Sequence, residues 1–347
     1  MSRYLFFVTQ LYSFAILRPL QEAIRARGDE VAWYLHNIDR QNLQPDEKLL
    51  DSVYAVKTYA PAAVYVPTNW VPDFFPGAKV QIFHGLANDA TGKKGHFRIR
   101  GLFDLYCTHA EPATRIFEDL ARQHANFHVT ETGWPKLDPL FRNEQMDLQQ
   151  YRPGDDRPVV LYGSTFSPSL TSAPVLLDTL RELSRRGDWH WLVTLHPKMD
   201  PALVAEYRAL EGANLQFIES NKDLMPALKA ADVMVCDTSS ISLEFMLLDK
   251  PVVTFRTRTP GEHVIDVTDT REIAPAIARA LTRPEPLMTA GRRYIDQLHP
   301  YRDGRSSERV LQATDEFIRV HADTLKPKPL NLWRKLQARK RLGYYRL

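Results

Sequence analysis

The stretch Ala231–Phe255, with the sequence ADVMVCDTSSISLEFMLLDKPVVTF, gives the clearest indication of the fold. Its first part, Asp232–Cys236, is a short apolar run with the length of a buried strand. The polar residues that follow, Asp237–Ser240, are of the types that begin helices. Apolar residues at helical spacing then occupy Ile241–Leu248, a Lys-Pro pair ends the helix, and Val252–Phe255 is a second strand.

The polar turn in this stretch is a candidate anion site. Hydroxyl residues that open a helix at the carboxyl end of a parallel strand leave backbone N–H groups and the positive end of the helix dipole facing outward. Such a place can hold a phosphate group. The same residues are also typical of a plain helix cap without a ligand. Glu244, on the helix itself, either binds ribose hydroxyls or lies on a solvated face.

The composition is that of a soluble globular protein with room for two domains, with 347 residues, 44% hydrophobic and 25% charged. Two cysteines, Cys107 and Cys236, lie in apolar strand-like runs and indicate a reducing compartment. The net charge is +3, but residues 326–347 carry eight Lys or Arg and no Asp or Glu, which leaves −5 on residues 1–325. No apolar stretch approaches the ~18–20 residues of a membrane span.

Two series of strands and helices follow one another along the chain. The first opens with a strand at Tyr4–Val8, a helix over residues 12–26, Gly28, and a strand at Val31–Leu35, which is the start of a doubly wound parallel sheet. The second begins at Pro158, after a polar linker. We expect an α/β protein of two Rossmann-like doubly wound domains facing a central cleft, with a single barrel as the lesser alternative. The expected parts are residues 1–150, residues 151–325 and a basic amphipathic tail, 326–347.

Four polar motifs follow predicted strands, where ligands of such sheets bind. They are His84-Gly85, Gly163-Ser164-Thr165, His196-Pro197-Lys198 and Asp237-Thr238-Ser239-Ser240. His84 is a candidate general base, because imidazole titrates near neutral pH. His196 and Lys198 suit a phosphate or pyrophosphate leaving group. Either histidine could instead pack a turn without contacting a substrate.

Two further segments are open to more than one interpretation. Asp303-Gly304 leads into a long helix predicted over Ser306–Ala322, where Ser307 caps the helix and Arg309 reaches a phosphate, or the whole is an ordinary capping box. A basic loop with Lys93, Lys94, Arg98 and Arg100 is either solvated or a surface for an anionic acceptor.

The tail mixes cations with Leu332, Trp333 and Leu336. This composition is that of an interfacial segment drawn to anionic lipid, and the alternative is a disordered basic tail. Motifs for a nicotinamide or flavin cofactor, a metal-dependent transferase and a P-loop are absent from the sequence. We therefore expect no cofactor, no metal and no nucleic-acid partner.

In chain order, several motifs resemble those of the CDP-glycerol glycerophosphotransferases, the teichoic-acid polymerase and primase family. They are His84-Gly85 with a downstream Lys, Thr132–Asp138, Leu161–Phe166, Leu195-His196-Pro197, Asp237-Thr238-Ser239-Ser240 and Asp303-Gly304 with Ser307-Glu308-Arg309. The similarity covers about residues 79–315. It implies a GT-B fold without a metal, with an N-terminal acceptor domain and a C-terminal domain that binds most of the donor nucleotide.

The resemblance also implies roles for individual residues. His84 would be the base that activates the acceptor hydroxyl, and His196, Ser239, Ser240 and Arg309 would bind the donor diphosphate. The expected substrate-binding set is completed by Gly85, Lys94, Ser164, Thr165, Lys198, Asp237, Thr238, Glu244 and Ser307. The sequence departs from the family at Thr238, where Tyr is usual, at Glu244, where Asp is usual, and at Ser164 and Ser167, where Pro and Arg are common.

The expected function is metal-independent transfer of a glycerophosphate or similar phosphoalditol unit from a CDP-alditol to a hydroxyl of a cell-envelope glycan or lipid-linked acceptor. An inverting GT-B glycosyltransferase that uses a nucleotide sugar is the alternative, because the departures border the donor. A non-catalytic nucleotide-sugar or glycan-binding module is a third interpretation. The expected location is cytoplasmic and peripheral on the inner face of the cell membrane, with the tail on an anionic surface.

Overall fold

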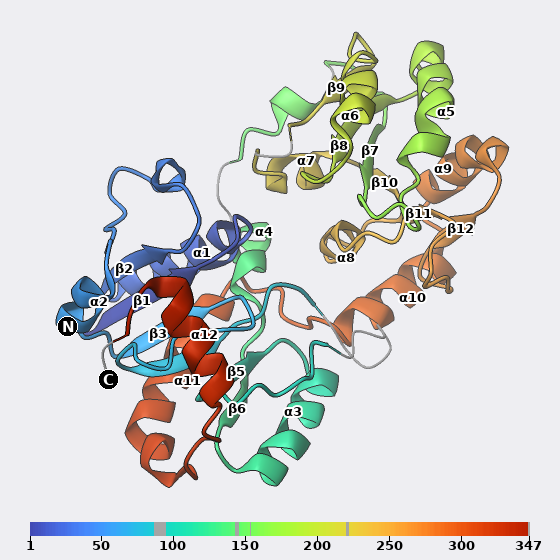
Figure 1. Ribbon diagram of the computed structural model, residues 1–347. Helices are drawn as coiled ribbons and strands as arrows, with labels where there is room; N and C mark the ends of the chain where they lie inside the picture. The colour runs from blue at the N-terminus through green and yellow to red at the C-terminus, as the bar shows by residue number, and fades with distance from the viewer. Residues whose placement is uncertain (87–94, 143–145, 153, 220–221, 346–347) are drawn as a thin grey trace. The chain divides into compact units, whose positions relative to one another are not determined.

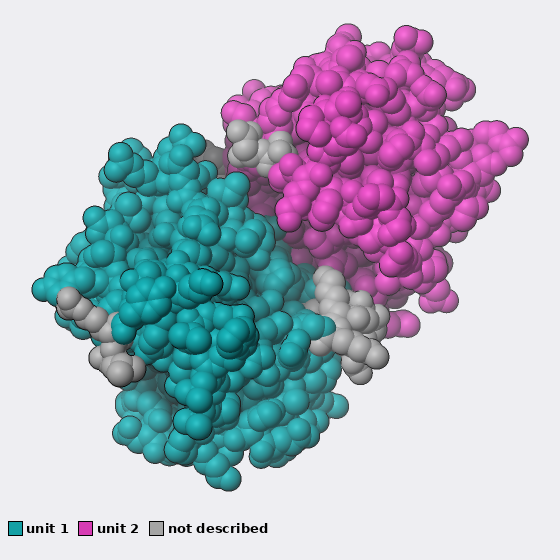
Figure 2. All heavy atoms as spheres, in the orientation of Figure 1, with its two compact units in different colours: residues 1–142, 297–347 teal, residues 143–296 magenta. Residues whose placement is uncertain are grey.

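The computed structural model describes residues 1–86, 95–142, 146–152, 154–219 and 222–345 (Figure 1). The chain forms two compact units, coloured separately in Figure 2. Unit 1 contains residues 1–142 and 297–347, and unit 2 contains residues 143–296. Each unit is built around its own parallel sheet, as the two strand–helix series predict.

Unit 1 has a sheet of six described strands in the order β2-β1-β3-β4-β5-β6, and every pair in it is parallel. The strands are β1 (Arg3–Val8), β2 (Glu30–Leu35), β3 (Ala63–Val66), β4 (Ala78–Gln81), β5 (Leu105–Thr108) and β6 (His128–Glu131). The helices are α1 (Ser13–Ala26), α2 (Val53–Tyr59), α3 (Glu111–His124), α4 (Asp138–Phe141), α11 (Ser306–Glu316) and α12 (Leu332–Leu342).

Unit 2 has a second parallel sheet of six described strands, in the order β12-β11-β10-β7-β8-β9. Its strands are β7 (Val159–Ser164), β8 (His190–Leu195), β9 (Leu215–Phe217), β10 (Val233–Cys236), β11 (Val252–Phe255) and β12 (Ile265–Val267). Its helices are α5 (Ala173–Arg186), α6 (Pro201–Arg208), α7 (Met225–Ala230), α8 (Ile241–Met246), α9 (Ile273–Leu281) and α10 (Glu285–Asp296). Counted from β7, this is the Rossmann strand order 3-2-1-4-5-6.

The central strands are buried on both faces, which is why they are continuous apolar runs. In β1 every residue from Tyr4 to Val8 is buried, and β7 and β10 are buried along their full length. Parallel strands covered by helices on both sides have this composition. Cys107 in β5 and Cys236 in β10 are free thiols within these runs, and burial raises the pKa of both.

The stretch that suggested the fold has the predicted order of elements. Strand β10, a polar turn, helix α8 and strand β11 follow one another, and β10 pairs with β11 and β7. The helix ends at Met246, two residues earlier than predicted. Because α8 is so short, its helix dipole contributes less to anion binding at its N-terminus than the sequence suggested.

The C-terminal segment does not follow the expected domain boundary at residue 325. Residues 297–325 lie in unit 1, not with the second series of strands (Figure 2). The buried carboxylate of Asp138 accepts hydrogen bonds from the backbone N–H groups of Ser306 and Ser307, both at 2.8 Å. Farther along α11, Thr314 Oγ1 accepts a hydrogen bond from the Tyr65 hydroxyl at 3.0 Å. These contacts join residues that are far apart in the sequence, so no local sequence pattern predicts them.

The long helix predicted over Ser306–Ala322 is divided. Regular α11 ends at Glu316, a π-helical turn covers Phe317–His321, and a 3₁₀ turn covers Ala322–Thr324. The tail then forms α12, which packs against unit 1. Arg339 pairs with Asp73 at 2.9 Å, and the ring of Tyr344 lies 4.7 Å from that of Phe74. Within the described ranges, no helix is both long enough and apolar enough to cross a bilayer.

We predict that acid destabilises unit 1 through His299, a residue of the returning segment. Its Nε2 accepts a hydrogen bond from the Trp134 backbone N–H at 3.0 Å, which requires the neutral ring. Burial lowers the pKa of His299 to about 4. As pH falls below about 6.5, the unfolded chain binds the proton first, so stability that is complete above pH 6.5 is lost progressively down to about pH 4.

The expected loss is about 3 kcal/mol in the free energy of unfolding, measured by urea titration between pH 7 and pH 4. The variant His299→Gln should lack this part of the pH dependence. The exposed His124 on α3 is the matched control, and His124→Gln should behave as the wild type. An unchanged pH dependence in His299→Gln would contradict the assignment.

Candidate functional site

The topology of unit 2 indicates where a ligand binds. The chain builds β7, β8 and β9 in one direction, then returns to the other side of β7 for β10, β11 and β12. The loops after β7 and β10 therefore leave the sheet in opposite directions, and the crevice between them is the usual ligand site of such sheets. The residues predicted from sequence, Ser164-Thr165 and Asp237–Ser240, lie at these two strand ends.

The carboxylate of Asp237 holds the two loops together. Its Oδ1 accepts a hydrogen bond from the Thr165 N–H at 3.0 Å. Its Oδ2 accepts from Ser164 Oγ at 2.5 Å, from the Ser172 N–H at 2.9 Å and from Ser172 Oγ at 3.0 Å. The residue is 1% exposed. The structure therefore turns Asp237 and Ser164 towards each other, and their contacts with one another fix the loop from β7 to α5.

His196 and Lys198 lie at the end of β8, next to β7. His196 Nδ1 accepts a hydrogen bond from the Lys198 N–H at 3.1 Å, so the proton of the neutral ring is on Nε2. Burial, followed by the charge of Lys198, lowers the pKa of His196, which keeps it neutral at pH 7. The ring of Phe166 lies 4.4 Å from that of His196. Nε2–H is thus a fixed donor available for an anion.

The turn after β10 differs in detail from a capped helix. Ser240 is exposed and makes no side-chain cap of α8, and Ser242 Oγ donates to the Ser239 carbonyl at 2.7 Å. Thr238 Oγ1 accepts a hydrogen bond from the Arg258 N–H at 3.0 Å. Glu244 is buried on α8 rather than solvated. The plain N-cap interpretation of Ser240 is therefore not what the structure has.

In unit 1, His84 lies near the corresponding switch point, between β1 and β3. His84 Nδ1 is 3.3 Å from the carbonyl oxygen of Pro67, which follows β3. The ring of Tyr12, which follows β1, is 5.5 Å from that of His84. His84 is exposed, and Gly85 leaves open space where a Cβ would stand. An exposed imidazole at such a position is suited to accept a proton from a substrate hydroxyl.

The residue before His84 is conformationally strained. Phe83 has φ of +56°, which is rare for an aromatic residue. Its ring is held in an aromatic cluster, 4.4 Å from the ring of His96 and 5.2 Å from that of Phe117. Strain of this kind, stabilised by surrounding packing, is found preferentially at functional sites. The strained backbone at Phe83 is therefore a second, independent indication that His84 belongs to a functional site, and it cannot be seen in the sequence.

Ser307 and Arg309 lie in unit 1, not in the predicted donor domain. Ser307 is fully buried, and the contact of its N–H with Asp138 caps α11 from outside the helix. Arg309 pairs with Asp303 and stacks over the ring of Tyr301 at 4.1 Å. Lys94 lies outside the described residues. The structure thus brings together two groups of predicted residues, one in each unit.

Sequence reasoning missed three residues at the edge of unit 2. Ser172 supplies two of the hydrogen bonds to Asp237, Phe166 lies against His196, and Arg258 contacts Thr238. The polar pair before α5 was a signal for Ser172, since such residues open helices. Nothing in the local sequence pointed to Arg258, because its loop follows a different strand.

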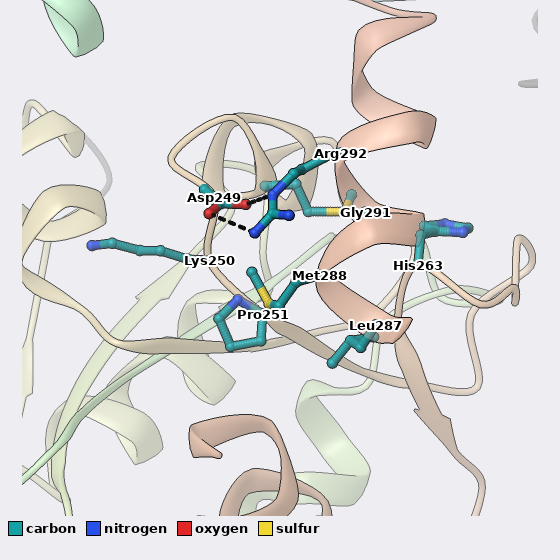
Figure 3. A pocket seen from close by; sticks show the side chains of 9 residues that line it. Asp249, Lys250, Pro251, His263, Leu287, Met288, Gly291 and Arg292 are labelled. Atoms are coloured by element: carbon teal, nitrogen blue, oxygen red, sulfur yellow. Dashed lines mark hydrogen bonds and ion pairs between the residues drawn. The ribbon is translucent and has the colours of Figure 1, made fainter. Parts of the chain in front are cut away.

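A small hollow elsewhere in unit 2 is not a substrate site. It is lined by residues of α8, α10 and the intervening loops, with Asp249 and Arg292 paired across it at 2.8 Å (Figure 3). Its volume is about 10 Å³, enough for one water molecule. None of the predicted site residues lines it. Among the described residues, no three His, Cys, Asp or Glu side chains are grouped as a metal site would require.

Known proteins resemble this chain in sequence and in fold. The teichoic acid glycerol-phosphate primase of Bacillus subtilis (strain 168) is 23% identical over an alignment of 236 residues that covers 64% of this chain and 60% of the primase. The chain thus spans about 60% of the length of that curated relative.

Solved structures extend the similarity over nearly the whole chain. The wall teichoic acid polymerase TagF matches with a TM-score of 0.67 and 15% identity, over 92% of this chain and 89% of TagF. TagF after a soak with CDPG matches with a TM-score of 0.66 and 16% identity, over 92% and 89%. A putative UDP-N-acetylglucosamine 2-epimerase from Listeria monocytogenes matches with a TM-score of 0.63 and 14% identity, over 91% and 96%. These likenesses confirm the GT-B-like fold of two parallel-sheet units.

The family described as CDP-Glycerol:Poly(glycerophosphate) glycerophosphotransferase matches residues 85–314, more than half of the chain. The matched region contains the β7, β8 and β10 loops of unit 2 as well as Asp138 and the start of α11 in unit 1. The chain therefore belongs to the CDP-glycerol:poly(glycerophosphate) glycerophosphotransferase family.

Proposed function

We propose that this protein transfers a glycerophosphate or similar phosphoalditol unit from a CDP-alditol to a hydroxyl of a cell-envelope glycan or lipid-linked acceptor. The observation that carries the proposal is the switch-point edge of unit 2, where Asp237 fixes two loops and His196 presents a donor N–H. Family membership supports the same chemistry. So does TagF, a protein of the same fold that was soaked with CDPG.

The reaction is a displacement at phosphorus. The acceptor oxygen forms a bond to the phosphorus that carries the alditol, the bond from that phosphorus to the bridging oxygen breaks, and CMP leaves with the electron pair. His84 takes the proton of the acceptor hydroxyl. In unit 2, His196 Nε2–H and the Ser239-Ser240 turn stabilise the charge on the departing phosphate. Arg309, in unit 1, adds a guanidinium for the same diphosphate.

The structure suggests two classes among the proposed substrate-binding residues. Asp237, Ser164 and Ser307 are buried, so in this proposal they position loops and a helix start rather than touch the donor. Thr165, Lys198, Ser239 and Ser240 are not buried, and they are the ones proposed to contact it. Glu244 is less completely buried than the first three, at 8% exposed, and we keep for it the ribose contact that the sequence suggested.

A second candidate function is glycosyl transfer from a nucleotide sugar. The observation that favours it is the fold shared with the putative UDP-N-acetylglucosamine 2-epimerase from Listeria monocytogenes, whose name includes a nucleotide sugar. The product distinguishes the two reactions. Phosphoalditol transfer releases CMP and forms a new P–O bond, whereas glycosyl transfer releases a nucleoside diphosphate and forms a new C–O bond.

We predict that His84→Gln strongly slows turnover and leaves donor binding intact. Loss of a general base costs about 10²- to 10⁴-fold in rate. The measurement is CMP release from CDP-glycerol in the presence of an acceptor, with the dissociation constant of CDP-glycerol measured by titration calorimetry. The donor constant should change by less than about threefold, because His84 contacts the acceptor. His124→Gln, at an exposed histidine of the same unit, should retain full activity.

Three results would contradict parts of this proposal. Substantial CMP release by His84→Gln would remove the base assignment. Donor binding without CMP release by the wild type would favour a binding module, and release of a nucleoside diphosphate from a sugar donor would favour glycosyl transfer.

We also propose that the protein is cytoplasmic and works at the inner face of the membrane through α12. Helix α12 belongs to unit 1 and is labelled in Figure 1. It is held on this unit by Asp73, which pairs with Lys335 and Arg339, and by the contact between the rings of Tyr344 and Phe74. The same helix exposes Leu332 and Trp333 at 70% each and Leu336 at 53%. Exposed Trp and Leu side chains on a helix rich in Lys and Arg suit an anionic bilayer surface.

The matching prediction uses substitutions of these exposed side chains, since truncation would also uncover the core of unit 1. The double variant Trp333→Ser, Leu336→Ser should sediment with phosphatidylglycerol vesicles at least about tenfold more weakly, because each lost side chain removes more than 1 kcal/mol of apolar burial. Val175→Ser, at an exposed apolar residue of α5, is the control and should bind as the wild type. If the double variant sediments with vesicles as strongly as the wild type, the proposal that α12 binds the membrane is wrong.

A further inference from the structure

Three loops meet at the carboxyl edge of the unit 2 sheet. The Asp237 carboxylate joins the loop after β7 to the turn after β10. The loop after β11 is attached to that turn by the hydrogen bond from the Arg258 N–H to Thr238 Oγ1, at 3.0 Å. Its own shape is fixed by Asp266, whose Oδ1 accepts hydrogen bonds from Thr254 Oγ1 at 2.8 Å and from the Thr257 N–H at 3.1 Å. The edge is therefore a connected rim.

The guanidinium of Arg258 returns to the first of these loops. Its Nη2 donates to Ser169 Oγ at 3.3 Å, a contact that orients the side chain and uses one of its five N–H donors. Neighbouring arginines of the unit are paired differently, such as Arg271 with Asp269 and Arg292 with Asp249. Within the described part of the chain, Arg258 has no carboxylate at ion-pair distance. The charge is thus held in place but not neutralised.

The strand order arranges charge along the rim. Arg258 follows β11, the hydroxyls of Thr238, Ser239 and Ser240 follow β10, and Lys198 follows β8 beyond β7. Strands are about 4.8 Å apart, so the two cations flank a stretch of roughly 14 Å with hydroxyl and N–H donors between them. The Asp237 carboxylate inside this stretch is already occupied by its four hydrogen bonds. Such a rim is complementary to a linear dianion.

We propose that Arg258 is a diphosphate-binding residue of the donor site. Its planar fork suits two phosphate oxygens at once, and its tether to Thr238 and Ser169 holds it ready before the ligand arrives. The ligand class is a nucleoside diphosphate or its ester. The inference rests on the proposed function in taking the donor to be such a molecule, and it adds a residue and a charge to the unit 2 site.

The test compares nucleosides with and without phosphates on the full chain. Titration calorimetry gives the affinities of cytidine, CMP and CDP for the wild type and for Arg258→Gln. Loss of a charge-assisted contact should weaken CDP binding about 10- to 100-fold and leave cytidine binding unchanged. The CDP affinity of Arg258→Lys should lie between those of the wild type and Arg258→Gln, since lysine keeps the positive charge but lacks the planar guanidinium fork. The wild-type preference for CDP over cytidine should also shrink as salt is raised.

The matched control is Arg256→Gln. Arg256 is exposed on the same loop, but its side chain donates to the Thr268 carbonyl at 3.0 Å and lies over the ring of Phe255. This variant should bind CDP as the wild type does. CDP affinity of Arg258→Gln within twofold of the wild type would overturn the inference, as would an equal loss in Arg256→Gln.

The proposed function can fail separately. If the wild type prefers UDP or GDP to CDP, the assignment of a CDP-alditol donor is wrong, and the same comparison with the preferred diphosphate still tests Arg258. If the wild type binds no nucleoside diphosphate more tightly than its nucleoside, both the donor site and the role of Arg258 are refuted.

Discussion

The buried carboxylate of Asp237 is the interaction on which the proposed donor site depends. It takes four hydrogen bonds from the loop after β7 and thereby joins that loop to its own, which leaves the sheet in the opposite direction. A buried charge is stable only when its hydrogen-bonding capacity is met, so the Ser164-Thr165 turn and Ser172 must stay where the structure has them. The result is a rigid edge whose outward groups, His196 Nε2–H and the hydroxyls after β10, are placed before a substrate binds. Such preorganisation is what stabilisation of a leaving phosphate requires.

In unit 1, too, a buried carboxylate holds together segments that are distant in the sequence. The buried Asp138 carboxylate accepts two backbone N–H groups at the start of α11 and thereby returns the C-terminal segment to the first sheet. This return places Ser307 and Arg309 on the unit that carries His84. In the account proposed above, unit 1 therefore contributes both the base and a guanidinium. Unit 2 contributes the remaining donor contacts, including Arg258.

The sequence predicted those features of the structure that depend on residues close together in the chain. The continuous apolar runs identified the parallel strands, and polar residues after them identified His84, His196 and the Asp237 turn. The direction of side chains was not predictable, because Asp237 is turned inward by Ser172, 65 positions away. Membership of 297–325 in unit 1 depends on Asp138 and Tyr65, which lie 168 and 249 positions from their partners in α11. Arg258 was missed since its relevance comes only from strand order. The strain at Phe83 could not be predicted either, because it is recognised only from the backbone angle φ.

The most direct test of this account is the CDP affinity of Asp237→Asn, measured by calorimetry at a temperature where circular dichroism shows the variant to be folded. The amide replaces one accepting oxygen with an N–H₂ group that faces donors, so the loop after β7 should move and CDP binding should weaken at least about tenfold. The surface variant Asp155→Asn should bind as the wild type. A folded Asp237→Asn protein with wild-type CDP affinity would contradict the claim that this carboxylate builds the donor site.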